Sequence, residues 1–95
     1  MAFVLVVRMT ANEGAEDEAA ALIAELARAS RGEPGCELYL PCRDPEDART
    51  FLLYEQYRDR AAFEEHGASE HFQRIAVGQL FGLVSRERSF YETLV

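Results

Sequence analysis

The chain contains no lysine, and its ten basic residues are arginines scattered along the sequence. Aspartate and glutamate together number 17, which gives a formal net charge of −7 at pH 7. Nucleic-acid binding depends on clustered Lys or Arg that meet the phosphates, so this charge argues against a nucleic-acid partner. The acidic balance favours solubility and identifies no partner of its own.

Long apolar runs are also missing. No run approaches the ~20 residues that a membrane-spanning helix needs. The first residues, Met1 to Arg8, lack the basic region and the small-residue cleavage site of a signal peptide. We therefore expect a cytoplasmic protein with no membrane partner. A chain of 95 residues with 48% hydrophobic content is expected to form one domain over residues 1–95.

Cysteine and histidine are scarce, with two of each. Cys36 and Cys42 would share one face of a strand, too far apart for a disulfide, and we expect both to be buried as small apolar residues. An expected helix break at Gly67 separates His66 from His71 and spoils a shared ligand face, so we expect no metal site. No glycine-rich phosphate loop or dinucleotide fingerprint is visible, and we expect no flavin or nicotinamide cofactor.

Hydrophobic periodicity predicts an α+β chain. Alternation of apolar and polar residues predicts strands over 3–10, 36–43, 50–57 and 84–94. Helical spacing and capping residues predict helices over 15–30, from the cap Asp59 through Glu65, and over 70–81 after the cap Ser69. This order, β-α-β-β-α-β, is that of a ferredoxin-like fold with an antiparallel sheet and its helices on one side.

The first three predicted strands carry apolar or aromatic residues on both faces. Helices in this plan cover only one face of the sheet. Something else must cover the second face, and the simplest candidate is another copy of the chain. The pattern therefore predicts a homodimer.

Four short segments carry a resemblance to a known family. They are Glu33-Pro34-Gly35-Cys36, Tyr54-Glu55-Gln56-Tyr57, Ala62-Phe63-Glu64-Glu65-His66 and Ser69-Glu70-His71-Phe72. In this order and at these separations, they resemble the antibiotic biosynthesis monooxygenase family over essentially the whole chain. The resemblance implies a dimeric α/β barrel, in which two sheets pack face to face, with a pocket in each subunit between sheet and helices.

The family resemblance implies several chemistries. Some members oxygenate quinols or polyketide aromatics with dioxygen and no metal or flavin, others degrade haem, and relatives isomerise a small phosphorylated sugar-like signal. Haem-degrading relatives are marked by an Asn, a Trp and a His, and Val7, His66 and Ala76 stand at the equivalent positions. None of the three matches, which disfavours haem degradation.

The same segments supply candidate site residues. Glu55 shares a strand face with Tyr57, and burial of that face would raise the pKa of the Glu55 carboxyl, although a purely structural carboxylate is also consistent with the pattern. We expect His66 to act as the catalytic base, Glu55 to orient it and Tyr57 to contact the substrate. Further substrate-binding candidates, which could instead pack in the core or the dimer interior, are His71, Phe63, Phe72 and Tyr54.

The function that we expect is a cofactor-independent monooxygenase acting on a small electron-rich aromatic, either a quinol or a phenolic or polyketide-like compound. A base is needed because the substrate anion, rather than the neutral compound, can pass a single electron to dioxygen. The same groups could serve an isomerase of a small phosphorylated carbonyl compound. A dimer that binds a metabolite without catalysis is a third possibility, and the sequence leaves all three open.

Overall fold

The structure, a computed structural model, describes all 95 residues. Its elements in chain order are β1 (Phe3–Ala11), α1 (Glu16–Ser30), β2 (Cys36–Asp44), β3 (Asp47–Tyr57), α2 (Arg60–Ala68), the π-helical segment η1 (Phe72–Val77), the 3-10 turn η2 (Leu80–Gly82) and β4 (Val84–Glu92). The strands form one antiparallel sheet in the order β2-β3-β1-β4. The predicted ferredoxin-like α+β fold is confirmed.

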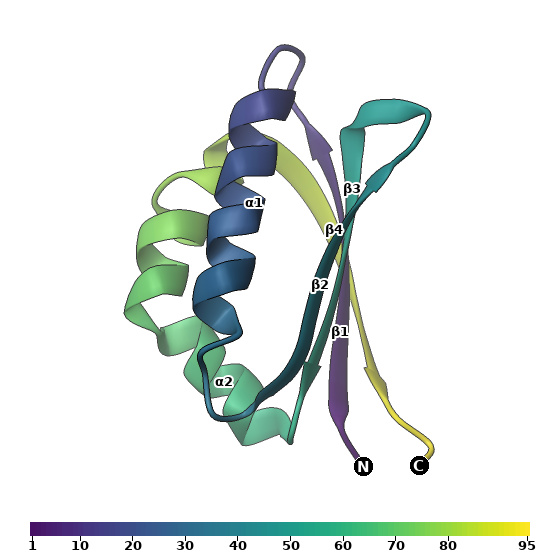
Figure 1. The fold of residues 1–95 in the computed structure, drawn as a ribbon, viewed down its shortest axis with the longest axis vertical. Helices are drawn as coiled ribbons and strands as arrows, with labels where there is room; N and C mark the ends of the chain where they lie inside the picture. Colours follow the sequence, from purple (N-terminus) through teal and green to yellow (C-terminus); the bar gives the residue numbers. More distant parts are fainter.

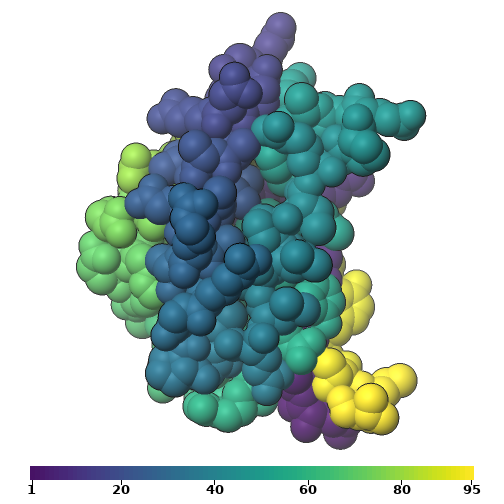
Figure 2. Space-filling view, viewed as in Figure 1, coloured from purple at the N-terminus to yellow at the C-terminus, as the bar shows by residue number.

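All the helical segments lie on one side of the sheet (Figure 1). The two termini meet at one end of the molecule, where the backbone N–H of Thr93 donates to the carbonyl of Ala2 at 3.0 Å. In the space-filling view, the C-terminal residues (yellow) project beside the start of β1 (Figure 2). None of the helices combines the length and the apolar character needed to span a membrane.

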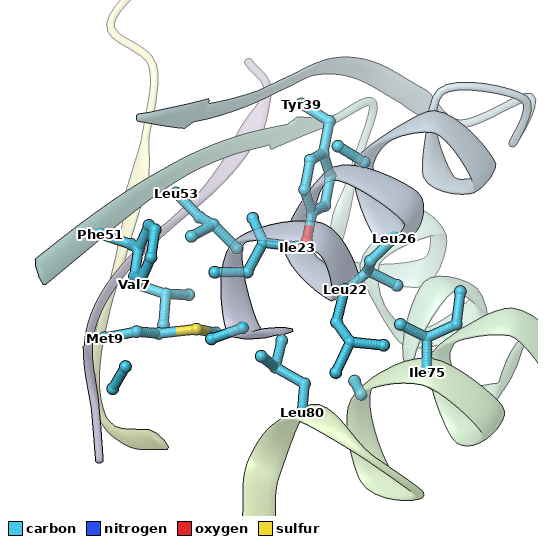
Figure 3. Close-up of a cluster of buried hydrophobic side chains, with 14 of the residues drawn as sticks. Val7, Met9, Leu22, Ile23, Leu26, Tyr39, Phe51, Leu53, Ile75 and Leu80 are labelled. Atoms are coloured by element: carbon cyan, nitrogen blue, oxygen red, sulfur yellow. The ribbon is translucent and has the colours of Figure 1, made fainter. Parts of the chain in front are cut away.

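The core fills the space between the sheet and α1. Side chains such as Val7 and Leu53 point from the strands toward Leu22 and Leu26 of the helix (Figure 3). These residues follow the two periods predicted from the sequence, alternate positions on the strands and a stripe at helical spacing on α1. Each such side chain stabilises the fold by about 1.5–3 kcal/mol on burial, so this layer fixes which sheet face meets the helices.

A β-bulge near the start of β2 reverses the expected facing of Cys36. The pairing shifts register so that Cys36 lies opposite Tyr57, a core residue, whereas Leu38 lies opposite Gln56. Directly opposed residues share a sheet face, so Cys36 packs against the core and Cys42 faces outward. The prediction that both cysteines are buried on one face is therefore wrong: Cys36 is half-buried, Cys42 is exposed, and both are free thiols.

Helix α2 begins as predicted but ends later. The Asp59 carboxylate accepts a hydrogen bond from the backbone N–H of Ala62 at 2.8 Å, which caps the helix. The helix continues through Gly67 to Ala68, so the break predicted at Gly67 is wrong. As a result His66 lies inside the last turn of α2, held by its helical neighbours.

The chain direction changes at Ser69. Its hydroxyl accepts a hydrogen bond from the backbone N–H of Phe72 at 3.2 Å, which caps the next segment as predicted. That segment is not a regular α-helix over 70–81, because its centre is the π-helical η1 and its end is the 3-10 turn η2. π-helical turns are rare in proteins and are frequent at functional sites.

The outward face of the sheet is apolar and uncovered. Leu38, Leu40 and Leu52 are 43%, 46% and 44% exposed, respectively. The register places them on the face away from the helices, together with Tyr54. This arrangement agrees with the apolar patterning on both strand faces that the sequence shows.

Gly35, in the loop between α1 and β2, lets that loop contact α2 directly. A Cβ at position 35 would lie 2.4 Å from the Cβ of Ala62, closer than two such atoms can approach. We expect Gly35→Ala to lower the free energy of unfolding by about 1–3 kcal/mol, measured by urea denaturation. Gly67→Ala is the matched control, because a Cβ there meets nothing within 4 Å. Equal stability of the two variants would contradict the close contact at Gly35.

Candidate functional site

A cavity of about 140 Å³ lies between the sheet and the segments that follow β3. The residues that line it are Leu5, Val7, Met9, Leu26, Tyr39, Leu53, Glu55, Phe63, His66, Gly67, Phe72, Phe81, Arg86 and Arg88. Its wall is mostly apolar. An apolar cavity of about 150 Å³ accommodates benzene, so this cavity has the size and character for one aromatic ring.

His66 reaches the cavity from the last turn of α2 and is 2% exposed. Its Nδ1 lies 2.8 Å from Oε2 of Glu33, and its Nε2 lies 3.7 Å from Oε1 of Glu55. Burial lowers the pKa of His66 below its ordinary value, and Glu33 opposes that shift. We infer from the hydrogen bonds that the neutral ring carries its proton on Nδ1 and leaves Nε2 as an acceptor.

Glu55 stands in the middle of β3 on the helix side of the sheet and is 3% exposed. Burial raises the pKa of its carboxyl to about 7, although hydrogen bonds from Tyr57 and Tyr39 act in the opposite direction. The Tyr57 hydroxyl donates to Oε1 at 2.5 Å. Burial and the adjacent carboxylate raise the pKa of both tyrosines well above the ordinary value, so both remain protonated donors. Glu55 is thus a buried carboxyl that exchanges its proton near neutral pH.

Glu33, in the loop after α1, connects the two histidines. Its Oε2 lies 2.8 Å from Nδ1 of His66 and 2.5 Å from Nε2 of His71. Glu33 therefore holds the orientation of the His66 ring from the side away from Glu55. This is the orienting role that the sequence led us to expect of Glu55.

Glu33, His66 and His71 form the one group in the structure that could hold a metal ion. Their ligand atoms all lie within 4.8 Å of one another, so the reason for expecting no shared ligand face, a break at Gly67, is wrong. Two nitrogen or oxygen ligands on one tetrahedral zinc ion lie about 3.3 Å apart, given bonds of about 2.0–2.1 Å. The shorter 2.5 and 2.8 Å separations are those of hydrogen bonds. The geometry therefore fits a hydrogen-bonded cluster better than a ligand set.

The predicted site residues occupy three places. Those that line the cavity are Glu55, His66, Phe63 and Phe72. Tyr57 and His71 lie behind its wall, as hydrogen-bond partners of Glu55 and Glu33. Tyr54 is not brought to the cavity: it follows the alternation of β3 to the outer face, where its hydroxyl donates to Oε1 of Gln56 at 3.0 Å.

Four residues near the cavity were not predicted from the sequence as site residues. Glu33, Tyr39, Arg86 and Arg88 all lie in or beside its wall. Glu33 is 33 residues from His66 in the sequence, so no local pattern indicated their contact. The sheet face on which Tyr39 and the two arginines lie is set by strand pairing. Because β4 is mostly polar, alternation along it does not indicate which of its faces is the inner one.

Comparison with known proteins identifies the family of this chain. The profile described as "Antibiotic biosynthesis monooxygenase" matches residues 2–77. The chain belongs to the antibiotic biosynthesis monooxygenase family. The resemblance drawn from the four sequence segments is therefore confirmed. The match includes Glu33, Glu55, His66 and His71, whereas η2 and β4 lie beyond it.

Two known proteins are similar to this chain. A Mycobacterium tuberculosis protein named "Putative monooxygenase Rv0793" is 36% identical over 62 residues, which cover 63% of this chain and 60% of the relative's length. The crystal structure of PA3566 from Pseudomonas aeruginosa is 30% identical, with a TM-score of 0.90 over 99% of this chain and 95% of that one.

A third structural neighbour is more distant in sequence. SnoaB from Streptomyces nogalater, a cofactor-independent oxygenase, is 21% identical, with a TM-score of 0.86 over 99% of this chain and 94% of its own. At this level of identity the likeness is one of fold.

Proposed function

We propose that this protein is a cofactor-independent monooxygenase that oxidises a small electron-rich aromatic, a quinol or a phenolic or polyketide-like compound, with dioxygen. One observation carries the proposal: Glu55 and His66 form a buried proton-accepting pair at the wall of an apolar cavity sized for an aromatic ring. The family description, a monooxygenase, supports it. SnoaB shows that the same fold can serve an oxygenase without a cofactor.

The proposed reaction begins with removal of a hydroxyl proton. A quinol in the cavity presents its hydroxyl to Nε2 of His66 beside Oε1 of Glu55, and the pair takes the proton. The resulting anion passes one electron to dioxygen, and the two radicals combine to form a peroxide on the ring carbon. The peroxide then breaks so that one oxygen atom remains in the product and the other leaves as water with two substrate protons. The substrate supplies all the electrons.

The surrounding residues keep the proton-accepting pair in its reactive state. Glu33 accepts a hydrogen bond from the Nδ1–H group of His66, which directs the free lone pair of Nε2 toward Glu55. Tyr57 and Tyr39 stabilise the Glu55 anion after it has lost its proton. Phe63 and Phe72 supply flat apolar surface beside His66, on which the substrate ring can pack.

The proposal is tested by oxygen uptake of metal-stripped protein with a panel of hydroquinones, naphthoquinols and anthrones. We expect uptake above the spontaneous rate, and with labelled dioxygen we expect one labelled atom in the product. A panel without enzyme-dependent uptake would overturn the proposal.

An isomerase of a small phosphorylated carbonyl compound is the second candidate. The Glu55–His66 pair could move a proton between the carbons beside a carbonyl group, and two arginines at the cavity could meet a phosphate. This reaction consumes no dioxygen. Proton exchange into the substrate without oxygen uptake would select the isomerase, and tight binding without either change would select a metabolite-binding module.

We also propose that the protein is a homodimer whose two sheets pack through their outward faces. The exposed leucines on that face support the proposal, because contiguous apolar surface of this kind marks interaction sites. The face is separate from the cavity, which lies on the helix side of the sheet.

The dimer can be tested with Leu52→Asp, which places a charge at the centre of the outward face. We expect at least a tenfold weaker dimer, on the order of 1.4 kcal/mol or more, measured by sedimentation. Val77→Asp is the control, because Val77 is 51% exposed but lies on η1 on the helix side. Similar sedimentation of both variants would contradict the proposed interface.

A further inference from the structure

Two arginines occupy inward positions on the edge strand β4. The register places Arg86 opposite Met9 and Arg88 opposite Val7. Met9 and Val7 belong to the core, and directly opposed residues share a sheet face, so both arginine side chains leave the strand on the helix side. Both line the cavity that also holds His66 and Glu55. Simple alternation would place apolar residues at these two positions.

Neither arginine has a carboxylate partner. The ion pairs within 4.0 Å involve other residues, although the chain carries 17 acidic side chains. Instead the Arg86 guanidinium lies 3.6 Å from the centre of the Phe81 ring, and the Arg88 guanidinium lies 5.3 Å from that of Phe90. These cation–π contacts hold two like charges at the same cavity without neutralising them. Partial burial, and after it the charge of Arg88, lower the pKa of Arg86.

We propose that Arg86 and Arg88 form an anion subsite, and that the ligand of this cavity is an aromatic compound that carries a carboxylate or phosphate group. Guanidinium groups match the geometry of both anions. The inference rests on the proposed function for the reacting end of the substrate and extends it to the opposite end. The two arginines lie on β4, beyond residues 2–77, the stretch that matches the family.

The sheet register sets the length of such a ligand. Glu55 pairs with Leu5 on β1, and Arg88 pairs with Val7, so Glu55 and Arg88 are separated by two strand spacings and two residues. With strands about 4.8 Å apart and a rise of about 3.3 Å per residue, their Cα atoms lie about 12 Å apart. Their side chains bridge part of that gap, which leaves space for one ring between the hydroxyl and the acidic group, in agreement with the cavity volume of about 140 Å³.

Charged residues on an edge strand also have a role that needs no ligand. Inward-pointing charges stop an exposed edge from pairing with another sheet. That role predicts that removal of the arginines promotes aggregation and leaves ligand affinity unchanged. Ligand binding therefore separates the two explanations.

The subsite is tested by calorimetry with the full chain and pairs of phenolic ligands, with dioxygen excluded so that no oxidation takes place. Phenol is paired with 4-hydroxybenzoate and with 4-hydroxyphenyl phosphate, and the two anionic ligands distinguish carboxylate from phosphate. We expect an anionic ligand to bind at least about tenfold more tightly than its neutral partner at low salt, with a smaller preference at high salt. Arg86→Gln with Arg88→Gln should remove the preference by weakening the binding of the anionic ligand about tenfold more than that of the neutral one. Arg28→Gln, an exposed arginine in α1, is the control.

Equal affinities within all pairs, or a preference that survives the double substitution, would overturn the subsite. Its failure is distinguishable from failure of the proposed function. An anion preference without any oxygen uptake would keep the subsite and remove the monooxygenase. Oxygen uptake by the wild-type protein, together with equal affinities for anionic and neutral ligands, would keep the monooxygenase and remove the subsite.

Discussion

Replacing His66 by alanine should lower the rate of oxygen uptake by about 10²–10⁴-fold, the usual contribution of a positioned general base. The expectation follows from the position of Nε2, which faces the cavity beside Glu55 while Nδ1 is fixed by Glu33. Because the substrate anion must form before dioxygen reacts, loss of the base should reduce kcat more than it raises KM. Steady-state oxygen consumption over a range of substrate concentrations measures both constants.

His71→Ala is the matched control for His66→Ala. His71 also contacts Oε2 of Glu33 but does not line the cavity, so its loss removes a histidine from the same cluster without touching substrate. We expect its rate to stay within about tenfold of wild type, since a remote partner acts only by orienting Glu33. Circular dichroism checks that both variants are folded. Equal losses in the two variants would contradict the assignment of the base to His66.

Glu55→Gln should stabilise the protein at alkaline pH, even though it removes a member of the proposed catalytic pair. Folding raises the pKa of the Glu55 carboxyl from 4.5 to about 7, so the folded state favours the protonated form. The contribution of Glu55 to stability is therefore fully present below about pH 4.5 and is lost as the pH rises through about 7. The shift corresponds to a cost on the order of 3 kcal/mol for the ionised form above pH 7.

Urea denaturation at about pH 4.5 and about pH 8.5 measures this effect. We expect Glu55→Gln to be close to wild type at the lower pH and more stable by about 2–3 kcal/mol at the higher pH. Glu65→Gln, on the exposed side of α2, should change stability little at either pH. If the stability of Glu55→Gln changes with pH in the same way as that of wild type, ionisation of the Glu55 carboxyl does not destabilise the folded state.

The stability and the activity of Glu55→Gln are physically linked. A carboxyl that is costly to ionise in the folded protein is also one that holds a proton near neutral pH. Ionisation of Glu55 therefore lowers the free energy of unfolding at the position where a proton acceptor is needed. Higher stability together with lower activity in Glu55→Gln would be the expected trade-off at a catalytic site.

The local features of this fold follow directly from the sequence. The stripe on α1 and the alternation on β1 and β3 depend on neighbours in the chain, and these elements form where they were predicted. Burial of Glu55 could also be anticipated, because its strand neighbours on the same face, Phe51 and Leu53, are apolar. The caps at Asp59 and Ser69 lie in short local patterns and were found in the same way.

Features that depend on pairing between distant segments could not be predicted. The bulge that turns Cys36 inward is a property of the β2–β3 register, which alternation within β2 does not reveal. Glu33 contacts His66 because a loop and a helix meet at Gly35, and no periodicity reports that contact. The inward facing of Arg86 and Arg88 likewise depends on pairing with β1.

The buried proton-accepting pair can be observed directly by NMR, without knowledge of the substrate. Protein labelled with ¹³C in glutamate side chains and ¹⁵N in histidine rings would be titrated from about pH 4 to about pH 9, with Glu55→Gln used to assign the Glu55 signal. We predict that the Glu55 carboxyl titrates with a midpoint near 7 and that His66 is neutral at pH 7, with its proton on Nδ1. A Glu55 midpoint near 4.5, or a doubly protonated His66 ring at pH 7, would contradict the proposed catalytic pair.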